Sequence, residues 1–231
     1  MKIVSLNIRH GGGKRIRNIL NYLEKYDSEI IVVTEYRNNE NGDLLITYLQ
    51  KQGYSFEKYN GDEKENTVCI FSKLKFNNIH RLENHKNIVG IEINNIEIYG
   101  VYFPQKNEKI NTYQKLKELI DKNTKTLIIG DFNTGISEYD TSNNSKFYCE
   151  SEFKELSQNI LRDSYRHKHG LEREYTWNSN SGNEFRIDHC LVSENILDKV
   201  NTSYEHSTRN EISDHSAMIV ELDIRDDFIL K

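Results

Sequence analysis

The strongest constraint on the fold is the order in which strand-like and helix-like patterns follow one another. Residues 4–8 alternate between apolar and polar side chains, the period of two that is typical of a strand. Residues 16–23 place apolar side chains on one face of a helix, and residues 30–33 form a short apolar run typical of a buried strand. The chain is therefore expected to open with a strand-helix-strand unit.

The same alternation continues to the end of the chain. Helix patterns cover residues 44–49, 113–120 and 153–160, and strand patterns cover residues 67–71, 88–93, 96–103, 126–130, 175–177, 185–192 and 217–222. Asn94 and Asn95 separate two of these strands and predict a tight hairpin, because asparagine tolerates positive φ. Two similar halves of this kind predict an α/β fold, a four-layer sandwich of two packed mixed β-sheets with helices on the outer faces.

One domain is expected over residues 1–231. A chain of 231 residues can bury one good core, and 36% hydrophobic residues spread along it argue against disorder. The sole proline, Pro104, argues against a proline-rich linker, and the polar stretch 141–145 is too short for a domain boundary. We interpret that stretch as a surface loop near a site.

Charge and cysteine usage bear on partners and location. The formal net charge of -5 does not indicate a polyanion partner, and the basic stretch 14–17 is typical of the polar face of a helix. Cys69, Cys149 and Cys190 lack C-x-x-C spacing, which argues against a disulfide framework and against a zinc site. No apolar run reaches transmembrane length. We expect a cytoplasmic protein without a membrane span, and we assume a monomer.

The segment 130–133, with the sequence Gly-Asp-Phe-Asn, is the most informative local feature for chemistry. Residues i and i+2 of a strand point the same way, so Asp131 and Asn133 are expected to project together while Phe132 packs on the opposite side. Gly130 permits a close approach of another segment. In isolation, an Asx turn that closes the strand explains the same residues equally well.

Other polar residues stand at the ends of apolar runs. Arg186 and Asp188 share one strand face, which alone is more typical of a surface ion pair. Asp214 and His215 come just before an apolar strand, and Glu35 follows an apolar run in which a charge is costly unless the strand ends there or the charge binds something. Together these residues indicate a site.

At this point the chain resembles the endonuclease/exonuclease/phosphatase superfamily, and within it the exonuclease III type of abasic-site endonuclease. The resemblance rests on seven short motifs in order, which span nearly the whole chain: residues 6–8, 34–35, 102–105, 130–133, 175–177, 186–189 and 213–215. Any one motif is weak, but the ordered set is specific.

The resemblance implies a role for each matching residue around the metal and the water. Glu35 would bind Mg²⁺, with Mn²⁺ as a substitute, and Asn7 and Asp214 would lie near the metal. Asp131 and Asn133 would position the attacking water. Hard cations prefer the carboxylate and amide oxygens that these residues carry, and a carboxylate can take the proton of an attacking water.

The resemblance also implies contacts to the phosphate. His215 would contact the phosphate and be oriented by Asp188, and Tyr102 would hold the phosphate or stabilise its charge. A histidine paired with a carboxylate is held protonated and can donate to phosphate. Arg9 and His10 could also contact phosphate, although a plain glycine-rich turn explains their segment equally well.

The sequence departs from the exonuclease III pattern at two places. Thr34 stands where those relatives usually carry glutamine. Trp177 reads as a core or sheet aromatic, and residues 178–182 form a polar stretch without the aromatic cluster with which abasic-site enzymes recognise a flipped-out sugar. The sequence therefore does not predict specificity for abasic sites.

Three functions remain open. The first hypothesis is a Mg²⁺-dependent DNA endonuclease or exonuclease that hydrolyses phosphodiester bonds by metal-assisted attack of water. The alternative is a phosphatase or phosphodiesterase of a phosphoinositide, a sphingolipid or a small phosphorylated molecule. A positive groove beside the site would favour the first, and an apolar lip or closed pocket the second. A binding module without activity is disfavoured, because the residues of a reaction centre are all present.

Overall fold

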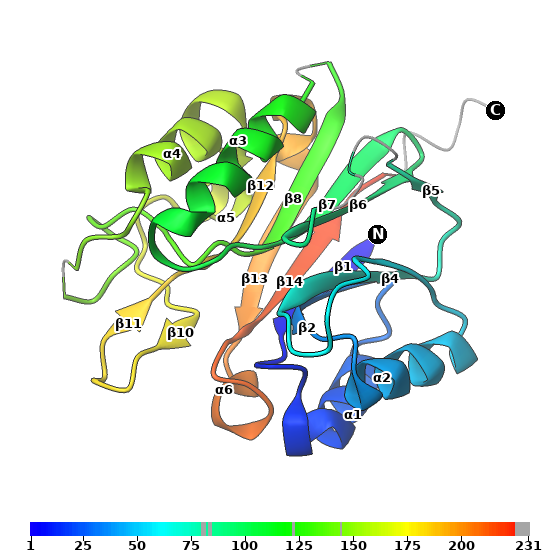
Figure 1. Ribbon diagram of the computed structural model, residues 1–231. Helices are drawn as coiled ribbons and strands as arrows, with labels where there is room; N and C mark the ends of the chain where they lie inside the picture. Colours follow the sequence, from blue (N-terminus) through cyan, green and yellow to red (C-terminus); the bar gives the residue numbers. More distant parts are fainter. Residues whose placement is uncertain (80–81, 83–84, 122, 144, 225–231) are drawn as a thin grey trace.

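A computed structural model describes residues 1–79, 82, 85–121, 123–143 and 145–224. Two six-stranded sheets pack face to face, and helices cover their outer faces (Figure 1). This confirms the predicted α/β sandwich of two mixed sheets. None of the helices in the described ranges combines the length and the apolar composition of a membrane span.

The first sheet brings the two ends of the chain together around the opening strand-helix-strand unit. Its strand order is β13-β14-β1-β2-β4-β3, and only the β1–β2 pair is parallel. The strands are β1 (Lys2–Asn7), β2 (Ile30–Tyr36), β3 (Ser55–Lys58), β4 (Thr67–Ser72), β13 (Val200–Glu205) and β14 (Ala217–Leu222).

The second sheet is built from the middle of the chain. Its order is β5-β6-β7-β8-β12-β9, and only the β7–β8 pair is parallel. The strands are β5 (Asn77–Asn78), β6 (Ile88–Ile93), β7 (Ile96–Tyr102), β8 (Lys125–Asp131), β9 (Arg162–Asp163) and β12 (Asp188–Val192). Asn94 and Asn95 have φ of 51° and 61°, which confirms the predicted tight hairpin between β6 and β7.

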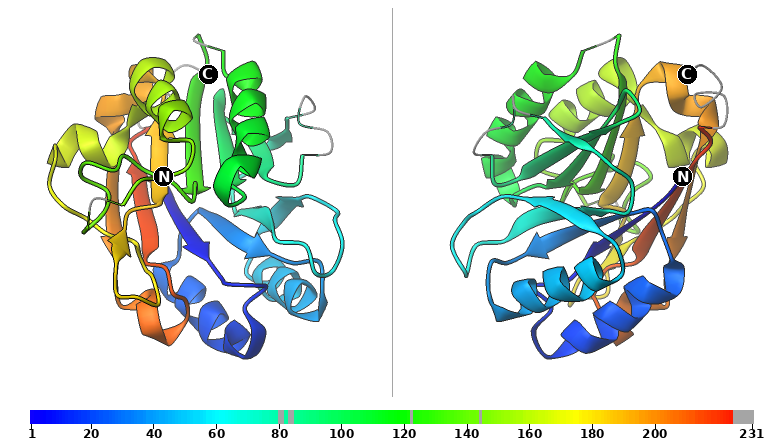
Figure 2. Two further views of the ribbon diagram at one scale, coloured as in Figure 1. Left: turned by 60° about the vertical axis from the view of Figure 1, so that its left-hand side comes forward. Right: turned by 90° about the vertical axis from the view of Figure 1, so that its right-hand side faces the viewer.

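Three apolar clusters hold the layers together. One fills the space between the two sheets, and the other two lie between each sheet and its helices. The first sheet is covered by α1 (Ile16–Tyr26) and α2 (Glu40–Lys51), and the second by α3 (Ile110–Leu119), α4 (Glu150–Lys154) and the π-helical turn η4 (Glu155–Ile160). Figure 2 shows the blue pair and the green group of helices on opposite outer sides.

Short elements complete the chain. They are the helices α5 (Ser164–His169) and α6 (Thr208–Glu211), the 3-10 turns η1 (Gly13–Arg15), η3 (Lys106–Lys109) and η5 (Glu194–Lys199), and the hairpin of β10 (Trp177–Asn178) and β11 (Glu184–Phe185). The sequence prediction lacks β3 and β13, because both edge strands are rich in polar residues and show no clear apolar pattern. Strand β13, for example, carries asparagine, serine and glutamate.

The predicted strand over residues 185–192 is too long. The structure divides it into β11 and β12, with Arg186 and Ile187 outside both strands. The Arg186 side chain is fully buried and binds the carboxylates of Asp140 and Asp163. These bonds hold the backbone at Arg186 away from a regular ladder, which the apolar pattern of the segment does not reveal.

Strand direction decides where the site lies. The parallel pair β1 and β2 carries Asn7 and Glu35 at or near its carboxyl ends, and the parallel pair β7 and β8 ends at Tyr102 and Asp131. Strand β12 runs antiparallel to β8, so its first residue, Asp188, lies beside Asp131. All of these side chains therefore lie at one edge of the sandwich, where both sheets contribute.

Candidate active site

The turn after β8 is an Asx turn, and it also presents Asp131 and Asn133 on the same side. The backbone N–H of Asn133 donates to Oδ1 of Asp131 at 2.8 Å, which is an Asx turn. The Asn133 side chain lies on the same side as Asp131, since its Nδ2 is 3.4 Å from Asp131 Oδ2 and 2.8 Å from the Phe103 carbonyl. Phe132 packs on the opposite side, stacked on Phe103. The turn thus presents a carboxylate and an amide together.

Asn7 joins the two sheets at this point. Its Nδ2 lies 2.9 Å from Asp131 Oδ2 and 3.1 Å from Glu35 Oε1, so one amide nitrogen contacts a carboxylate from each sheet. Glu35 has a φ of 52° and sits where the β2–β4 register shifts, a β-bulge that aims its side chain. Two carboxylates therefore converge in a mostly buried space.

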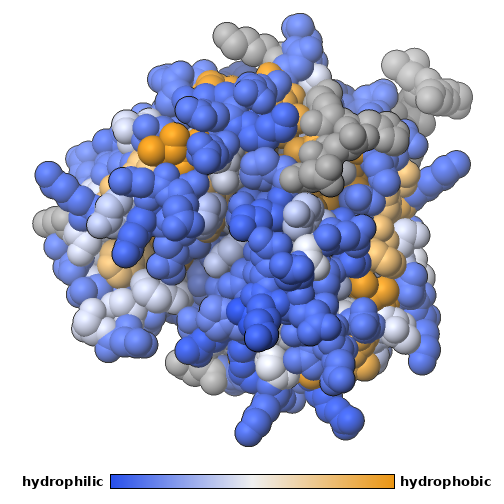
Figure 3. Space-filling model, viewed as in Figure 1, coloured by the Kyte–Doolittle hydropathy of each residue, from blue (hydrophilic) through white to orange (hydrophobic). Residues whose placement is uncertain are grey.

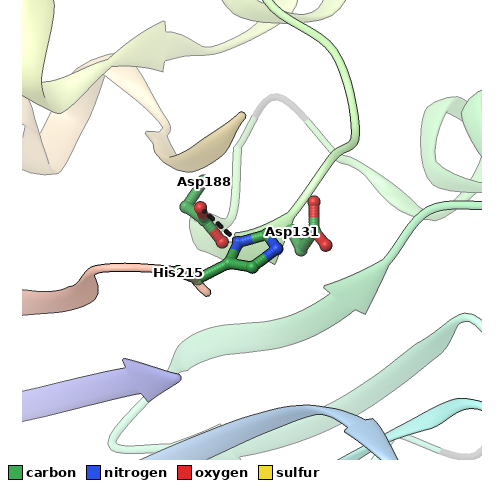
Figure 4. A group of neighbouring side chains, drawn as sticks. All are labelled: Asp131, Asp188 and His215. Carbon is green, nitrogen blue, oxygen red and sulfur yellow. Dashed lines mark hydrogen bonds and ion pairs between the residues drawn. The ribbon is translucent and has the colours of Figure 1, made fainter. Parts of the chain in front are cut away.

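Asp188 and His215 form a buried ion pair beside the turn. His215 Nδ1 lies 2.9 Å from Asp188 Oδ2, and Thr176 Oγ1 donates to the same oxygen at 2.6 Å. Burial lowers the pKa of His215, but the Asp188 carboxylate outweighs burial and raises this pKa to about 10. Figure 4 shows the imidazole between the carboxylates of Asp188 and Asp131. His215 is therefore an imidazolium donor at neutral pH.

For the Asp131 carboxyl, unlike for His215, burial decides the direction of the pKa shift. Burial raises the pKa of Asp131 to about 7, the negative charges of Asp188 and Glu35 add to the rise, and His215 counteracts it. A carboxyl with a pKa near neutrality can accept a proton from a water molecule and return it afterwards. Strongly shifted pKa values on neighbouring titratable groups are typical of reaction centres.

Tyr102, at the end of β7 in the second sheet, and Asn66, just before β4 in the first sheet, lie next to Glu35. Burial, and after it the charge of Glu35, raises the pKa of the Tyr102 hydroxyl, so this hydroxyl stays protonated and can donate. Asn66 Nδ2 lies 3.0 Å from Glu35 Oε2 and 3.4 Å from Tyr102 Oη. Asn66 is absent from the sequence prediction, because a lone asparagine before a strand carries no distinctive signal.

Lys109 is a second residue that the sequence did not reveal. It is buried, and its Nζ donates to the Asn133 carbonyl at 2.6 Å. Burial lowers the pKa of Lys109 to about 8. The lysine supports the left-handed backbone of Asn133, whose φ is 50°. A lysine in a polar helix pattern reads as solvent-exposed, so only the folded chain shows this contact.

Asp214 lies at the outer part of the site. Trp177 Nε1 donates to Asp214 Oδ2 at 3.2 Å, and Arg9 Nε lies 3.7 Å from the same oxygen. His10 contributes its backbone N–H to Glu35 Oε2 at 2.8 Å. Arg9 and His10 thus belong to the site, and Trp177 is a site residue rather than only a sheet aromatic.

A cleft of about 450 Å³ brings together most of these groups. It is lined by Arg9, His10, Glu35, Tyr102, Gln105, Lys106, Lys109, Asp131, Asn133, Lys146, Phe147, Tyr148, Trp177, Asn180, Phe185, Ile187, Asp214 and His215. Residues 178–182 contain no aromatic side chain, and the rings beside Trp177 come from other segments. Phe185 lies 5.7 Å from Trp177 and 5.8 Å from Phe147 between ring centroids, so an aromatic wall forms from three separate segments.

Arg186 and Asp188 do not form the surface ion pair that their spacing alone favours. Arg186 does not pair with Asp188; its Nε binds Asp140 Oδ1 at 2.8 Å and its Nη2 binds Asp163 Oδ2 at 2.6 Å, with all three residues buried. The segment leaves the strand at Arg186, so the i and i+2 side chains no longer share a face. Arg186 therefore supports the site from behind and does not line it.

The donor set suits a divalent cation. Asp131, Asp188 and His215 place one potential ligand atom each within 4.8 Å of one another, and Glu35 faces Asp131 across Asn7. Because His215 is protonated and paired with Asp188, we favour Glu35 and Asp131 as the pair that attracts a cation. Asn7 presents its NH₂ group to both carboxylates, and its oxygen accepts from the Arg9 N–H, so coordination by Asn7 would need the amide turned over.

The fold and this site define a phosphodiester hydrolase. The family model described as Endonuclease/Exonuclease/phosphatase family matches residues 4–215, and the chain belongs to this family. A curated DNA-(apurinic or apyrimidinic site) endonuclease of Dictyostelium discoideum is 23% identical over 258 residues, which cover 97% of this chain and 71% of that protein.

Solved structures share the fold over the whole chain. A 3'-5' exonuclease from Neisseria meningitidis matches with a TM-score of 0.80 and 22% identity, covering 96% of this chain and 100% of that one. An AP endonuclease from Archaeoglobus fulgidus matches with a TM-score of 0.79 and 18% identity, covering 97% of this chain and 100% of that one.

Proposed function

We propose that this protein is a Mg²⁺-dependent nuclease that hydrolyses phosphodiester bonds of DNA by attack of water. The observation that carries the proposal is the composition of the cleft. It holds a carboxyl with a raised pKa, an imidazolium, converging carboxylates, lysines and aromatic rings in one space. Each of these groups matches a need of phosphodiester hydrolysis.

Asp131 and Asn133 activate the water in this proposal. The Asp131 carboxylate takes the proton of the water as its oxygen attacks phosphorus, and the Asn133 amide fixes the direction of attack. The Asx turn and the Lys109 contact hold the two groups in position. A geometry that is set before the substrate arrives costs nothing at the moment of reaction.

His215 and Tyr102 bind the phosphate. The imidazolium of His215 and the phenol of Tyr102 both donate, and both face the charge that builds up on the nonbridging oxygens. Asp188 keeps His215 protonated and orients its ring. Because His215 and Tyr102 both act as donors to the phosphate, Asp131 is the proton acceptor in this proposal.

Mg²⁺ would be held by Glu35 with Asp131 and Asn7 beside it and with Asp214 further out, and Mn²⁺ could replace it. When bound, the cation neutralises charge on the phosphate and on the leaving oxygen. Water activation and phosphate binding are carried out by the side chains described above.

DNA is favoured over a lipid by the rim of the cleft. Lys106 and Lys146 are exposed at the cleft, and an aromatic wall stands beside them, a combination suited to phosphates and bases. Hydrophilic residues also cover most of the face seen in Figure 3. A structure titled as the 3' phosphatase NExo from Neisseria bound to a product DNA hairpin matches this chain with a TM-score of 0.80 at 21% identity.

The test compares substrates and one variant. Supercoiled plasmid, a duplex with an abasic site and a phosphoinositide are incubated with wild-type protein in Mg²⁺ and in EDTA, and with Asp131→Asn. We expect cleavage of DNA in Mg²⁺ only, reduced roughly 10²–10⁴-fold in the variant. Cleavage that persists in EDTA or in the variant would contradict the mechanism, and hydrolysis of only the phosphoinositide would establish the alternative function.

We further propose that residues 1–231 act as one domain, as a monomer in the cytoplasm. Two of the three free thiols, Cys69 and Cys190, are buried as small apolar side chains in the sheets, which suits a reducing compartment.

A further inference from the structure

Tyr148 is an exposed aromatic residue at the mouth of the cleft. It is 55% exposed, and it lines the same cleft as Asp131 and His215. Among the described residues, its side chain makes no hydrogen bond, ion pair or ring contact. A single exposed aromatic is ordinary on a protein surface. Its place beside the reaction centre, with an open ring face, is what requires an explanation.

The backbone holds Tyr148 in a defined position relative to the catalytic turn. Thr134, the residue after Asn133, donates from its Oγ1 to the Tyr148 carbonyl at 3.0 Å. The N–H of Phe147 donates to Ser137 Oγ at 3.1 Å, and the Phe147 ring packs edge-on against Phe185. Phe147 thus points into the aromatic wall, while Tyr148 stays outside it and remains available to a ligand.

Positive charges flank this ring. Lys146, two residues before Tyr148, is exposed, and Lys106 is exposed at the same cleft. The Lys106 carbonyl lies 3.8 Å from the sulfur of Cys149, so the segments that carry the two lysines meet directly beside Tyr148. An exposed aromatic ring in the same cleft as two cations is complementary to a base and its neighbouring phosphates.

We propose that Tyr148 stacks on an unpaired nucleobase next to the scissile phosphate, while Lys146 and Lys106 bind the phosphates that flank this base. This inference rests on the proposed nuclease function and specifies its substrate class. A base inside a continuous duplex has both faces covered by its neighbours, so only a frayed end, a gap or an unpaired nucleotide can offer its face to Tyr148. The preferred substrate is therefore DNA with an unpaired nucleotide at the cleavage position.

The test uses a hairpin DNA with an unpaired 3'-terminal 2-aminopurine, and the same hairpin with that base paired. Stacking on tyrosine quenches 2-aminopurine, so fluorescence in EDTA reports binding, and cleavage in Mg²⁺ is measured separately. We expect Tyr148→Leu to weaken binding and raise KM roughly tenfold for the unpaired hairpin, with kcat and the thermal midpoint unchanged. Tyr148→Phe and Tyr148→Trp should retain wild-type values, because they keep the ring.

Other outcomes would contradict the inference or the proposed function on which it rests. Equal KM values for Tyr148→Leu and wild-type protein, or a loss in Tyr148→Phe equal to that in Tyr148→Leu, would exclude stacking. For Lys146→Met, we expect the slope of log K against log salt to fall by about one unit, and an unchanged slope would remove the phosphate contact. If wild-type protein binds and quenches the hairpin without cleaving any DNA, the nuclease function fails while the base-binding site stands.

Discussion

In the mechanism that we propose, Asp131 and His215 are the two titrating residues that carry the chemistry. Burial raises the pKa of Asp131 to about 7, whereas Asp188 overcomes the effect of burial on His215 and raises its pKa to about 10. The base form of Asp131 and the acid form of His215 therefore coexist between these two values. A cation beside Asp131 would lower the pKa of Asp131 and widen this window on its acid side.

The proposed mechanism predicts a pH profile for DNA cleavage from these two groups. The rate should rise as Asp131 ionises, stay level, and fall near pH 10 as His215 loses its proton. Asp188→Asn removes the charge that keeps His215 protonated. The decrease of the rate on the alkaline side should therefore begin at a pH lower by roughly one unit or more. An NMR titration of the His215 ring measures the same shift without substrate, and an unchanged His215 pKa in Asp188→Asn would contradict the assignment.

At the scale of elements, a buried charge network joins segments that the chain separates widely. Arg186, just before β12, binds Asp163 of β9 and Asp140 of the loop after β8. The charge of Arg186 counteracts the effect of burial and lowers the pKa of both carboxyls. The network fixes the start of β12, and with it Asp188.

Arg186→Met should destabilise the protein by about 3–5 kcal/mol at pH 7, because it removes the cation that two buried carboxylates, Asp140 and Asp163, share. Both acids have folded pKa values below the unfolded ones, so their contribution is present above about pH 4 and is lost as the pH falls further. The difference between variant and wild-type protein in urea unfolding should therefore shrink at pH 3.

Arg162→Met is the matched control for the arginine network. Arg162 pairs with Glu194 at the surface, and such pairs contribute about 0–1 kcal/mol. If both variants lost the same small amount of stability, the buried network would not carry the role assigned to it.

At the scale of the whole molecule, the site depends on how closely the two sheets approach. Gly100 in β7 lies against Val32, Val68 and Ile70 of the first sheet, and a Cβ there would come within 2.9–3.1 Å of their side chains. The sheets meet closely at this point, two residues before Tyr102. The convergence of Glu35 from one sheet with Asp131 from the other requires such an approach.

Gly100→Val should lower stability by about 1–3 kcal/mol, because overpacking forces the sheets apart or the side chains off their rotamers. Val32→Ala in the same chain makes space beside it and should restore part of the loss, which a double-mutant cycle in thermal or urea unfolding measures. Strict additivity of the two changes would show that they do not touch.

The sequence by itself predicted most strands and helices in their order and the two-sheet sandwich, because apolar periodicity is a local signal. Its short ordered motifs named the candidate residues of the site for the same reason. The apolar run at residues 126–130 predicted a strand that ends at Asp131. The hairpin at Asn94 and Asn95 could be predicted because asparagine tolerates the positive φ that both residues adopt. The sequence also resembled the Endonuclease/Exonuclease/phosphatase family to which the chain belongs.

Only the tertiary structure decided which polar residues share a space. Arg186 does not share a strand face with Asp188; it binds two acidic residues that lie 23 and 46 positions earlier in the chain. Lys109 is buried, and its ammonium group donates to the Asn133 carbonyl. The aromatic wall likewise formed from Phe147, Trp177 and Phe185, which no local pattern connects. The physical reason is that side-chain contacts between distant segments depend on strand direction and sheet packing, whereas a sequence pattern reports only its own neighbourhood.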